Sequence, residues 1–263
     1  MKKLAALIGL GALLLTSAAS GQDVATVTSA SRSFQAVYSV TARGMNVGDF
    51  NYSFAQSGEN YQANAQRRLT GFARLLSNST QDFTYSAQGS VGADGALHPA
   101  TYQHRGGKRN RLVRATFSAN DIVTTTDPPN MSMGHPPATT AQKRGAIDQL
   151  SAIASMVLAS GDPCSRTIHI YLDGRSRFDF AMTPNGQVSV NTPAYRGQAF
   201  RCRVQFTPIA GFSDPQNAAV LTFLFVPTSS GMFAPVRIEM PSDDAGIIQL
   251  NAQRITVNGQ QLR

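Results

Sequence analysis

The sequence predicts a mainly β fold: a single curved antiparallel sheet that forms an open, barrel-like wrap around one amphipathic α-helix. Short segments in which apolar and polar residues alternate recur along most of the chain, and this period of two is typical of strands with one buried face. Gly, Asn and Asp residues suited to turns separate the segments. Short turns make neighbouring strands antiparallel, and a sheet of about a dozen strands must curl or close to bury one face.

The first 21 residues have the pattern of a secretory signal peptide. Lys2 and Lys3 give a basic start, residues 4–15 are apolar, and residues 16–21 are small. The apolar run is too short to span a bilayer, which takes about 20 residues. We expect residues 1–21 to be removed on export and residues 22–32 to form a flexible lead-in. Residues 33–263 should then form one β-rich domain.

The first half of this domain predicts seven strands, the first two joined as a hairpin at Gly44. Glycine reaches positive φ without steric cost, so residues 92–95 are a second strong turn signal. Residues 71–77 carry apolar side chains at helical spacing and predict one short helical turn. The expected strands cover residues 33–41, 50–55, 61–68, 82–89, 101–105, 111–118 and 122–126.

Residues 127–140 contain four prolines and predict an extended loop, because proline lacks a backbone donor and is excluded from the middle of a sheet. The helix follows, over about residues 147–159, where apolar residues recur every three or four positions. Asp148 or Ser151 is expected to cap its start, and residues 161–163 (Gly-Asp-Pro) to end it.

Strands resume after the helix. The dipeptides Asp173-Gly174, Asn185-Gly186 and Asn258-Gly259 favour turns, and the second is expected to form a tight hairpin between two alternating segments. The expected strands cover residues 167–172, 177–182, 187–191, 198–207, 219–226, 235–240 and 246–257.

Composition narrows the class of protein and its partners. Hydrophobic residues make up 42% of the chain, enough for a sizeable core, while charged residues reach only 14% against about 25% in typical domains. The formal charge of +8 becomes +6 without Lys2 and Lys3 (+8 minus 2). A basic exported protein is attracted to anionic lipids or envelope polymers. We therefore expect such a ligand or an envelope protein as partner, and neither nucleic acid binding nor a membrane-spanning segment.

Cys164 and Cys202 are an even pair in a chain expected to enter an oxidising compartment, which favours a disulfide. The chain-entropy model gives about 4 kcal/mol of stabilisation for a loop of this length. Two buried free thiols or a redox pair are the alternatives, although redox motifs normally place their cysteines two residues apart.

Several short turn and packing segments resemble one family. They are Tyr38, Gly44-Met45-Asn46-Val47-Gly48, Asp94-Gly95-Ala96-Leu97-His98-Pro99 with Tyr102, Asp148-Gln149-Leu150-Ser151-Ala152, and Pro235-Val236-Arg237-Ile238. Through them nearly all of the mature chain resembles the domain of unknown function 3108 (DUF3108) family of proteobacterial envelope proteins. The resemblance implies a periplasmic protein with a curved β-rich fold, broadly similar to the lipoprotein carriers of the envelope. It implies no catalytic residue, and the cysteines are not among its landmarks.

The densest charge cluster comprises Arg105, Lys108, Arg109, Arg111 and Arg114. Arginine forks bind phosphates and sulfates in bidentate geometry, so these five are the candidate residues for an anionic ligand. The alternative is a solvated hairpin and the outer face of the next strand. The Gly-Gly-Lys fragment at 106–108 lacks the leading glycine and the spacer of a phosphate-binding loop.

No residue is assigned a catalytic, cofactor-binding or metal-binding role. The histidines, His98, His104, His135 and His169, lack the spacing that places two metal ligands on one helical face. The chain has no Gly-x-Ser-x-Gly elbow. The carboxylate pairs are Asp243-Asp244, which a turn explains, and Asp173 with Asp179.

The aromatic strand residues Phe50, Tyr52 and Phe54 line either a closed core or a cavity for an acyl chain. A curved sheet with one helix to fill it predicts an apolar groove, with the basic hairpin of residues 105–114 at its mouth. We therefore expect an exported, periplasmic, non-enzymatic protein that supports the cell envelope by binding a lipid-like ligand or a partner protein. Two alternatives stay open: an envelope-modifying hydrolase with a loop-assembled site, and a scaffold without a ligand cavity.

Overall fold

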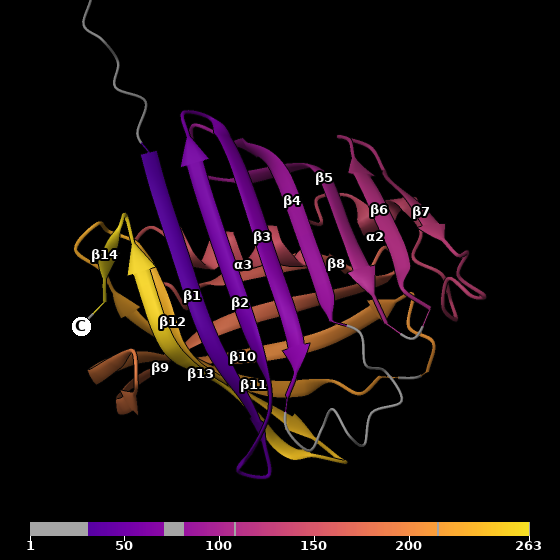
Figure 1. Cartoon of the computed structure of the whole chain (residues 1–263). Helices are drawn as coiled ribbons and strands as arrows, with labels where there is room; N and C mark the ends of the chain where they lie inside the picture. Colours follow the sequence, from indigo (N-terminus) through magenta and orange to yellow (C-terminus); the bar gives the residue numbers. More distant parts are fainter. Residues whose placement is uncertain (1–30, 71–81, 108, 215, 263) are drawn as a thin grey trace, which may run out of the picture.

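A computed structural model describes residues 31–70, 82–107, 109–214 and 216–262. The strands belong to one antiparallel sheet, in the order β7-β6-β5-β4-β3-β2-β1-β13-β12-β11-β10-β9-β8, with β14 added to β13 (Figure 1). β7 and β8 stand at the two ends of this order, so the sheet is open. The expected mainly β fold, with one curved antiparallel sheet around a helix, is confirmed.

Seven strands precede the helices: β1 (Ser31–Ala42), β2 (Met45–Ser57), β3 (Asn60–Leu69), β4 (Phe83–Val91), β5 (Leu97–Gly106), β6 (Arg111–Phe117) and β7 (Ile122–Asp127). The helices are α2 (Thr140–Lys143) and α3 (Gln149–Val157). The remaining strands are β8 (Arg166–Leu172), β9 (Ser176–Thr192), β10 (Tyr195–Ala210), β11 (Ala219–Pro227), β12 (Phe233–Ser242), β13 (Gly246–Val257) and β14 (Gln260–Gln261).

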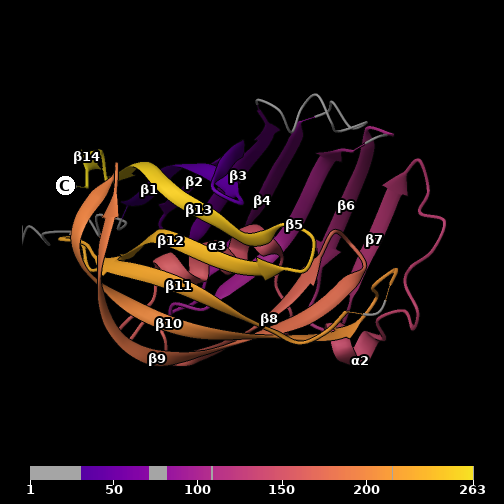
Figure 2. The ribbon, with the colours of Figure 1, turned by 90° about the horizontal axis from the view of Figure 1, so that it is seen from below.

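The sheet curls so that β1–β7 and β8–β13 face each other with α3 between them (Figure 2). The face that contacts α3 is called the inner face. The pairing of β1 with β13 joins the two halves, and it brings Phe34 opposite Val257 although they lie near opposite ends of the chain. Pairing between segments so distant in sequence is what allows one sheet to enclose a helix.

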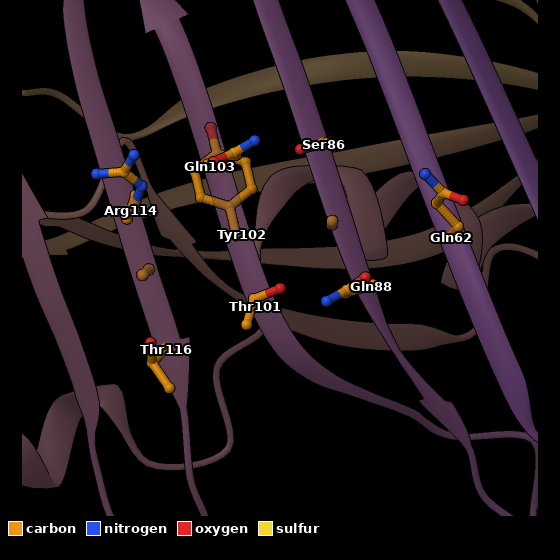
Figure 3. A pocket seen from close by; sticks show the side chains of 10 residues that line it. Gln62, Ser86, Gln88, Thr101, Tyr102, Gln103, Arg114 and Thr116 are labelled. Atoms are coloured by element: carbon orange, nitrogen blue, oxygen red, sulfur yellow. The ribbon is translucent and has the colours of Figure 1, made fainter.

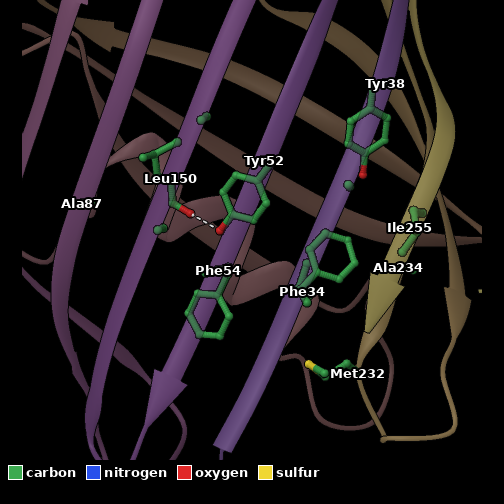
Figure 4. Packing of buried hydrophobic residues seen from close by; sticks show 14 of the residues in the cluster. Phe34, Tyr38, Tyr52, Phe54, Ala87, Leu150, Met232, Ala234 and Ile255 are labelled. Carbon is green, nitrogen blue, oxygen red and sulfur yellow. Dashed lines mark hydrogen bonds between the residues drawn. The ribbon is translucent and has the colours of Figure 1, made fainter. Parts of the chain in front are cut away.

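Two apolar clusters occupy the interior. Leu150, Ala154 and Val157 of α3 pack into a cluster that includes Phe34 and Phe54 (Figure 4). Ala152 and Met156, on another side of the helix, pack against Val204 and Phe223 of the second half of the sheet. Because both sides of α3 are buried, the apolar stripe that predicts the helix holds the two halves of the sheet together.

The boundaries of α3 differ slightly from the expected range of about 147–159. Asp148 caps the helix by accepting from the backbone N–H groups of Leu150 and Ser151, at 2.9 and 3.0 Å. Ile147 lies outside the helix and forms a parallel bridge with Ile170 of β8. This bridge covers part of the free edge of β8, so the residue before the cap is extended rather than helical.

The expected hairpin at Asn185-Gly186 is wrong. Gly186 has the expected positive φ of 75°, yet β9 runs through it from Ser176 to Thr192. Pro184 and Gln187 both pair with β10, opposite Cys202 and Phe200, with an irregularity between them. A bulge meets the same local conformational demand as a turn, and continued pairing with β10 keeps the strand intact.

The proline-rich segment lacks strand structure after Asp127, as expected, but it ends in the short helix α2, which the sequence did not predict. Backbone hydrogen bonds link it to the segment after β10, from His135 N–H to the Phe212 carbonyl and from Gly211 N–H to the Pro136 carbonyl. The loop is thereby fastened to the sheet.

Cys164 and Cys202 form a disulfide with their Cα atoms 5.1 Å apart. It links the segment after α3 to the inner face of β10. β1 begins at Ser31, two residues before the expected start of the domain. The expected signal peptide at residues 1–21, most of the expected lead-in, the helical turn expected at residues 71–77 and Lys108 lie outside the described residues.

Candidate functional site

Part of the inner face is apolar but only half-buried. The residues concerned are Phe50, Phe180, Phe206, Ile238, Met240 and Leu250, and we call them the inner apolar surface. Met240 lies two residues before the end of β12, and Phe206 and Phe180 pair with each other across β10 and β9, whereas α3 is only nine residues long. The helix therefore leaves these side chains partly accessible.

Strand register places these residues on the same face as the buried core. Phe50 stands opposite Tyr38, and it is two residues from Tyr52, whose hydroxyl donates to the Leu150 carbonyl of α3. Across the second half of the sheet, Leu250 pairs with Ile238. Side chains two apart along a strand share a face, so the surface continues the core toward one end.

Phenylalanines extend the surface over β9, β10 and β11. Phe180 and Phe206 lie 6.2 Å apart between ring centroids, and each also contacts Phe178, at 5.0 and 5.1 Å. Phe223 is 5.8 Å from Phe180 in edge-to-face geometry. Such contacts fix the ring positions and leave Phe180 and Phe206 half-buried.

One charged side chain borders this surface. Arg67 of β3 pairs with Phe50 on β2 and with Phe83 on β4, which places it on the inner face. Its guanidinium carbon lies 4.2 Å from the centroid of the Phe83 ring. Among the described residues Arg67 forms no ion pair, whereas its neighbour Arg68, on the outer face, pairs with Asp82 at 3.5 Å. Sequence reasoning missed Arg67, although Tyr61, Ala63 and Ala65 alternate in step with it.

A buried polar network supports the helix beside the surface. Asp148 is fully buried, and the Ser151 hydroxyl donates to its second carboxylate oxygen. Ser151 Oγ also lies 2.6 Å from the Tyr61 hydroxyl. Burial raises the pKa of the Asp148 carboxyl, and the hydrogen bonds from Ser151 and the backbone oppose that rise. A further bond, from the Tyr38 hydroxyl to the Pro235 carbonyl at 2.8 Å, joins two of the landmark segments. These landmarks therefore have a packing role.

The described basic residues predicted to bind an anionic ligand do not lie together: they are found on different faces of the sheet and in a turn. Arg105 and Arg114 are exposed and project from the outer faces of β5 and β6. Arg111 donates to the carbonyls of Pro128 and Pro129, at 2.8 and 3.3 Å. Arg109 is exposed in the turn. Of these four, Arg105 and Arg114 share one face, and it is the face opposite the inner apolar surface.

The histidines and carboxylates are also separate. His104 is buried beside Tyr102 and lies 3.8 Å from Asp173, while Asp179 contacts His169 and Arg177. Burial lowers the pKa of His104, against the opposite effect of Asp173. Within the described ranges, no three His, Cys, Asp or Glu residues come close enough to hold a metal ion.

A shallow depression of about 300 Å³ lies on the outer face of β3–β6 (Figure 3). Its lining includes the polar side chains of Gln62, Gln88, Gln103, Thr101 and Arg114. These residues alternate with inward-facing ones, which is the usual pattern of a solvent-facing sheet surface. The inner face, where apolar side chains stay half-buried, is the stronger candidate for a binding site.

The fold and this surface define an open, curved antiparallel sheet that encloses α3 and keeps an accessible apolar area on its inner face. A family model, Protein of unknown function (DUF3108), matches residues 37–253 of the 263. The chain belongs to this family, as the landmark segments indicated. No curated protein matches the chain. None of the described helices is long and apolar enough to cross a membrane.

Proposed function

We propose that this chain is an exported periplasmic protein of the cell envelope that binds a lipid-like ligand, without catalysis, on its inner apolar surface. The observation that carries the proposal is the half-buried state of Phe180, Phe206 and Met240 on a face that is otherwise core. Folding normally buries such side chains, and partly exposed apolar side chains gathered in one patch are typical of binding surfaces.

Export is supported by the basic and apolar start of the sequence and by the disulfide, which forms and persists in oxidising compartments. A lipid-binding role is compatible with both. It requires no catalytic residue, and Asp148 serves as a helix cap while His104 and His169 lie beside Asp173 and Asp179.

Binding of an uncharged apolar fluorophore, N-phenyl-1-naphthylamine, to the delipidated protein tests the proposal. Met240→Gln replaces an inner apolar side chain by a polar one of similar length. Full burial of such a side chain stabilises a complex by about 2 kcal/mol, and a half-buried one can contribute about half of this when a ligand covers it. Losing about 1 kcal/mol of binding free energy lowers affinity about fivefold.

The matched control is Val220→Gln, at an exposed position of β11 that does not belong to the inner face. The proposal expects unchanged fluorophore affinity in this variant. Equal losses in Met240→Gln and Val220→Gln, or no binding by the unmodified protein, would contradict it.

A scaffold role is the second candidate, and the free edge of β7 favours it. In the described sheet β7 pairs with β6 alone, and Val123 is 61% exposed. An unpaired strand edge accepts an added strand from a partner protein. Site-specific crosslinking from position 123 in envelope preparations tests this role, and it predicts a discrete crosslinked partner and no fluorophore binding.

A further inference from the structure

Arg67, a charged side chain beside the inner apolar surface, indicates what kind of ligand this surface would bind. Arg67 lies between Phe50 and Phe83 in a cross-strand row on the inner face. The Phe83 ring, 4.2 Å from the guanidinium carbon, supports the group by a cation–π contact. Such a contact uses the face of the guanidinium and leaves the N–H donors at its edge free.

The described groups around Arg67 do not neutralise it. Asp173, in the turn after β8, raises the pKa of the neighbouring Tyr85 and opposes the lowered pKa of His104. It lies 3.8 Å from Nδ1 of His104 and forms no ion pair with Arg67. Arg111, another cation near His104, already donates to two carbonyls of the proline-rich segment. One arginine with free donors therefore borders the apolar area.

We infer that the ligand is a long-chain carboxylate, with its hydrocarbon chain on the inner apolar surface and its carboxylate bound by Arg67. This inference rests on the proposed function. A guanidinium fork matches the two oxygens of a carboxylate in bidentate geometry, and one unpaired cation matches one negative charge. Arg67 is exposed, so its free donors are accessible to such a carboxylate.

The test compares palmitate, hexadecanol and palmitoyl lysophosphatidylglycerol as competitors of N-phenyl-1-naphthylamine. Palmitate and hexadecanol share a chain and differ in the charged head, while the lysolipid carries a phosphate. The inference expects palmitate to bind at least tenfold more tightly than hexadecanol. Arg67→Gln should abolish this advantage, and Arg67→Lys should restore part of it, because lysine keeps the charge but not the fork.

Arg68→Gln is the matched control, since Arg68 is the next residue of β3 and faces outward. It should leave the palmitate advantage unchanged, as should Arg105→Gln with Arg114→Gln on the outer face. The ratio of palmitate to hexadecanol affinity in the unmodified protein tests the inference even if an Arg67 variant fails to fold.

Every other outcome contradicts a specific part of the inference or of the proposed function. Equal affinities for palmitate and hexadecanol, or a palmitate advantage that survives Arg67→Gln, would refute the inference that Arg67 binds a carboxylate. Neither result would contradict the proposed function. A lysolipid that binds more tightly than palmitate and depends more on Arg67 would replace the carboxylate by a phosphate. Binding of no competitor and no fluorophore would refute the proposed function itself. A stable dimer that Met240→Gln dissociates would assign the surface to a second copy of the chain.

Discussion

Asp148 offers the sharpest test of how this fold is held together. Asp148→Ala removes the cap of α3. It leaves the buried N–H groups of Leu150 and Ser151 without a partner, at about 1–3 kcal/mol each. We expect a loss of at least about 2 kcal/mol in the free energy of unfolding. For a domain of this size that corresponds to a fall in Tm of about 4–8 °C.

The assay is urea denaturation of the mature protein followed by circular dichroism. Asp94→Ala is the control, because Asp94 also accepts from a backbone N–H, that of Ala96 at 2.9 Å, but in an exposed turn. Water replaces the lost acceptor there, so its cost should stay below about 1 kcal/mol. Equal costs for the two variants would refute the reasoning.

Asp148→Asn separates the charge from the cap. Burial raises the pKa of the Asp148 carboxyl, so the folded state binds more protons than the unfolded state, in which the pKa is about 3.9. The stabilisation linked to this carboxyl is therefore complete below the unfolded pKa and is lost as pH rises through the folded pKa. The amide does not titrate, so Asp148→Asn should gain stability relative to the unmodified protein between pH 4 and pH 7. A difference that does not change with pH would contradict this account.

Two further predictions concern covalent and steric constraints. Non-reducing peptide mapping of protein from periplasmic material should link Cys164 to Cys202 and place the mature N terminus between Ala19 and Gln22. Cys202→Ser should lower the free energy of unfolding by up to about 4 kcal/mol with little change in the circular dichroism spectrum. Recovery of both cysteines as free thiols would overturn the pairing. Gly211 and Gly186 both have positive φ, 82° and 75°. A Cβ added at Gly211 would clash with the Arg175 carbonyl oxygen, whereas no atom lies near a Cβ added at Gly186. Gly211→Ala should therefore lower Tm far more than Gly186→Ala, and equal effects in thermal melts would show that the close approach does not matter.

Local patterns predicted most elements because their causes lie within a few residues. The three-and-four spacing around Leu150 and Ala154 predicted α3, and Asp148 stands where a cap is needed. The hairpin predicted at Asn185-Gly186 is wrong because a turn and a bulge can both require a glycine with positive φ. Pairing with β10 on both sides of the dipeptide makes it a bulge. The sequence did not indicate Arg67 as a site residue, because a charged residue near the end of a strand usually faces solvent. Its alternation with Ala63 and Ala65 was the signal that it faces inward.

The sequence by itself determined the strand alternation, the helix α3 and the cysteine pair, since each depends on neighbouring residues or on residue counts. Only the tertiary structure decided which apolar side chains stay half-buried. That depends on where α3 stops covering the inner face and on the pairing of β1 with β13, which sets Tyr38 opposite Ala252. Periodicity assigns Phe180 and Phe54 equally to a buried face. Phe54 becomes core because the helix and strands close around it, and Phe180 remains accessible because the helix lies elsewhere.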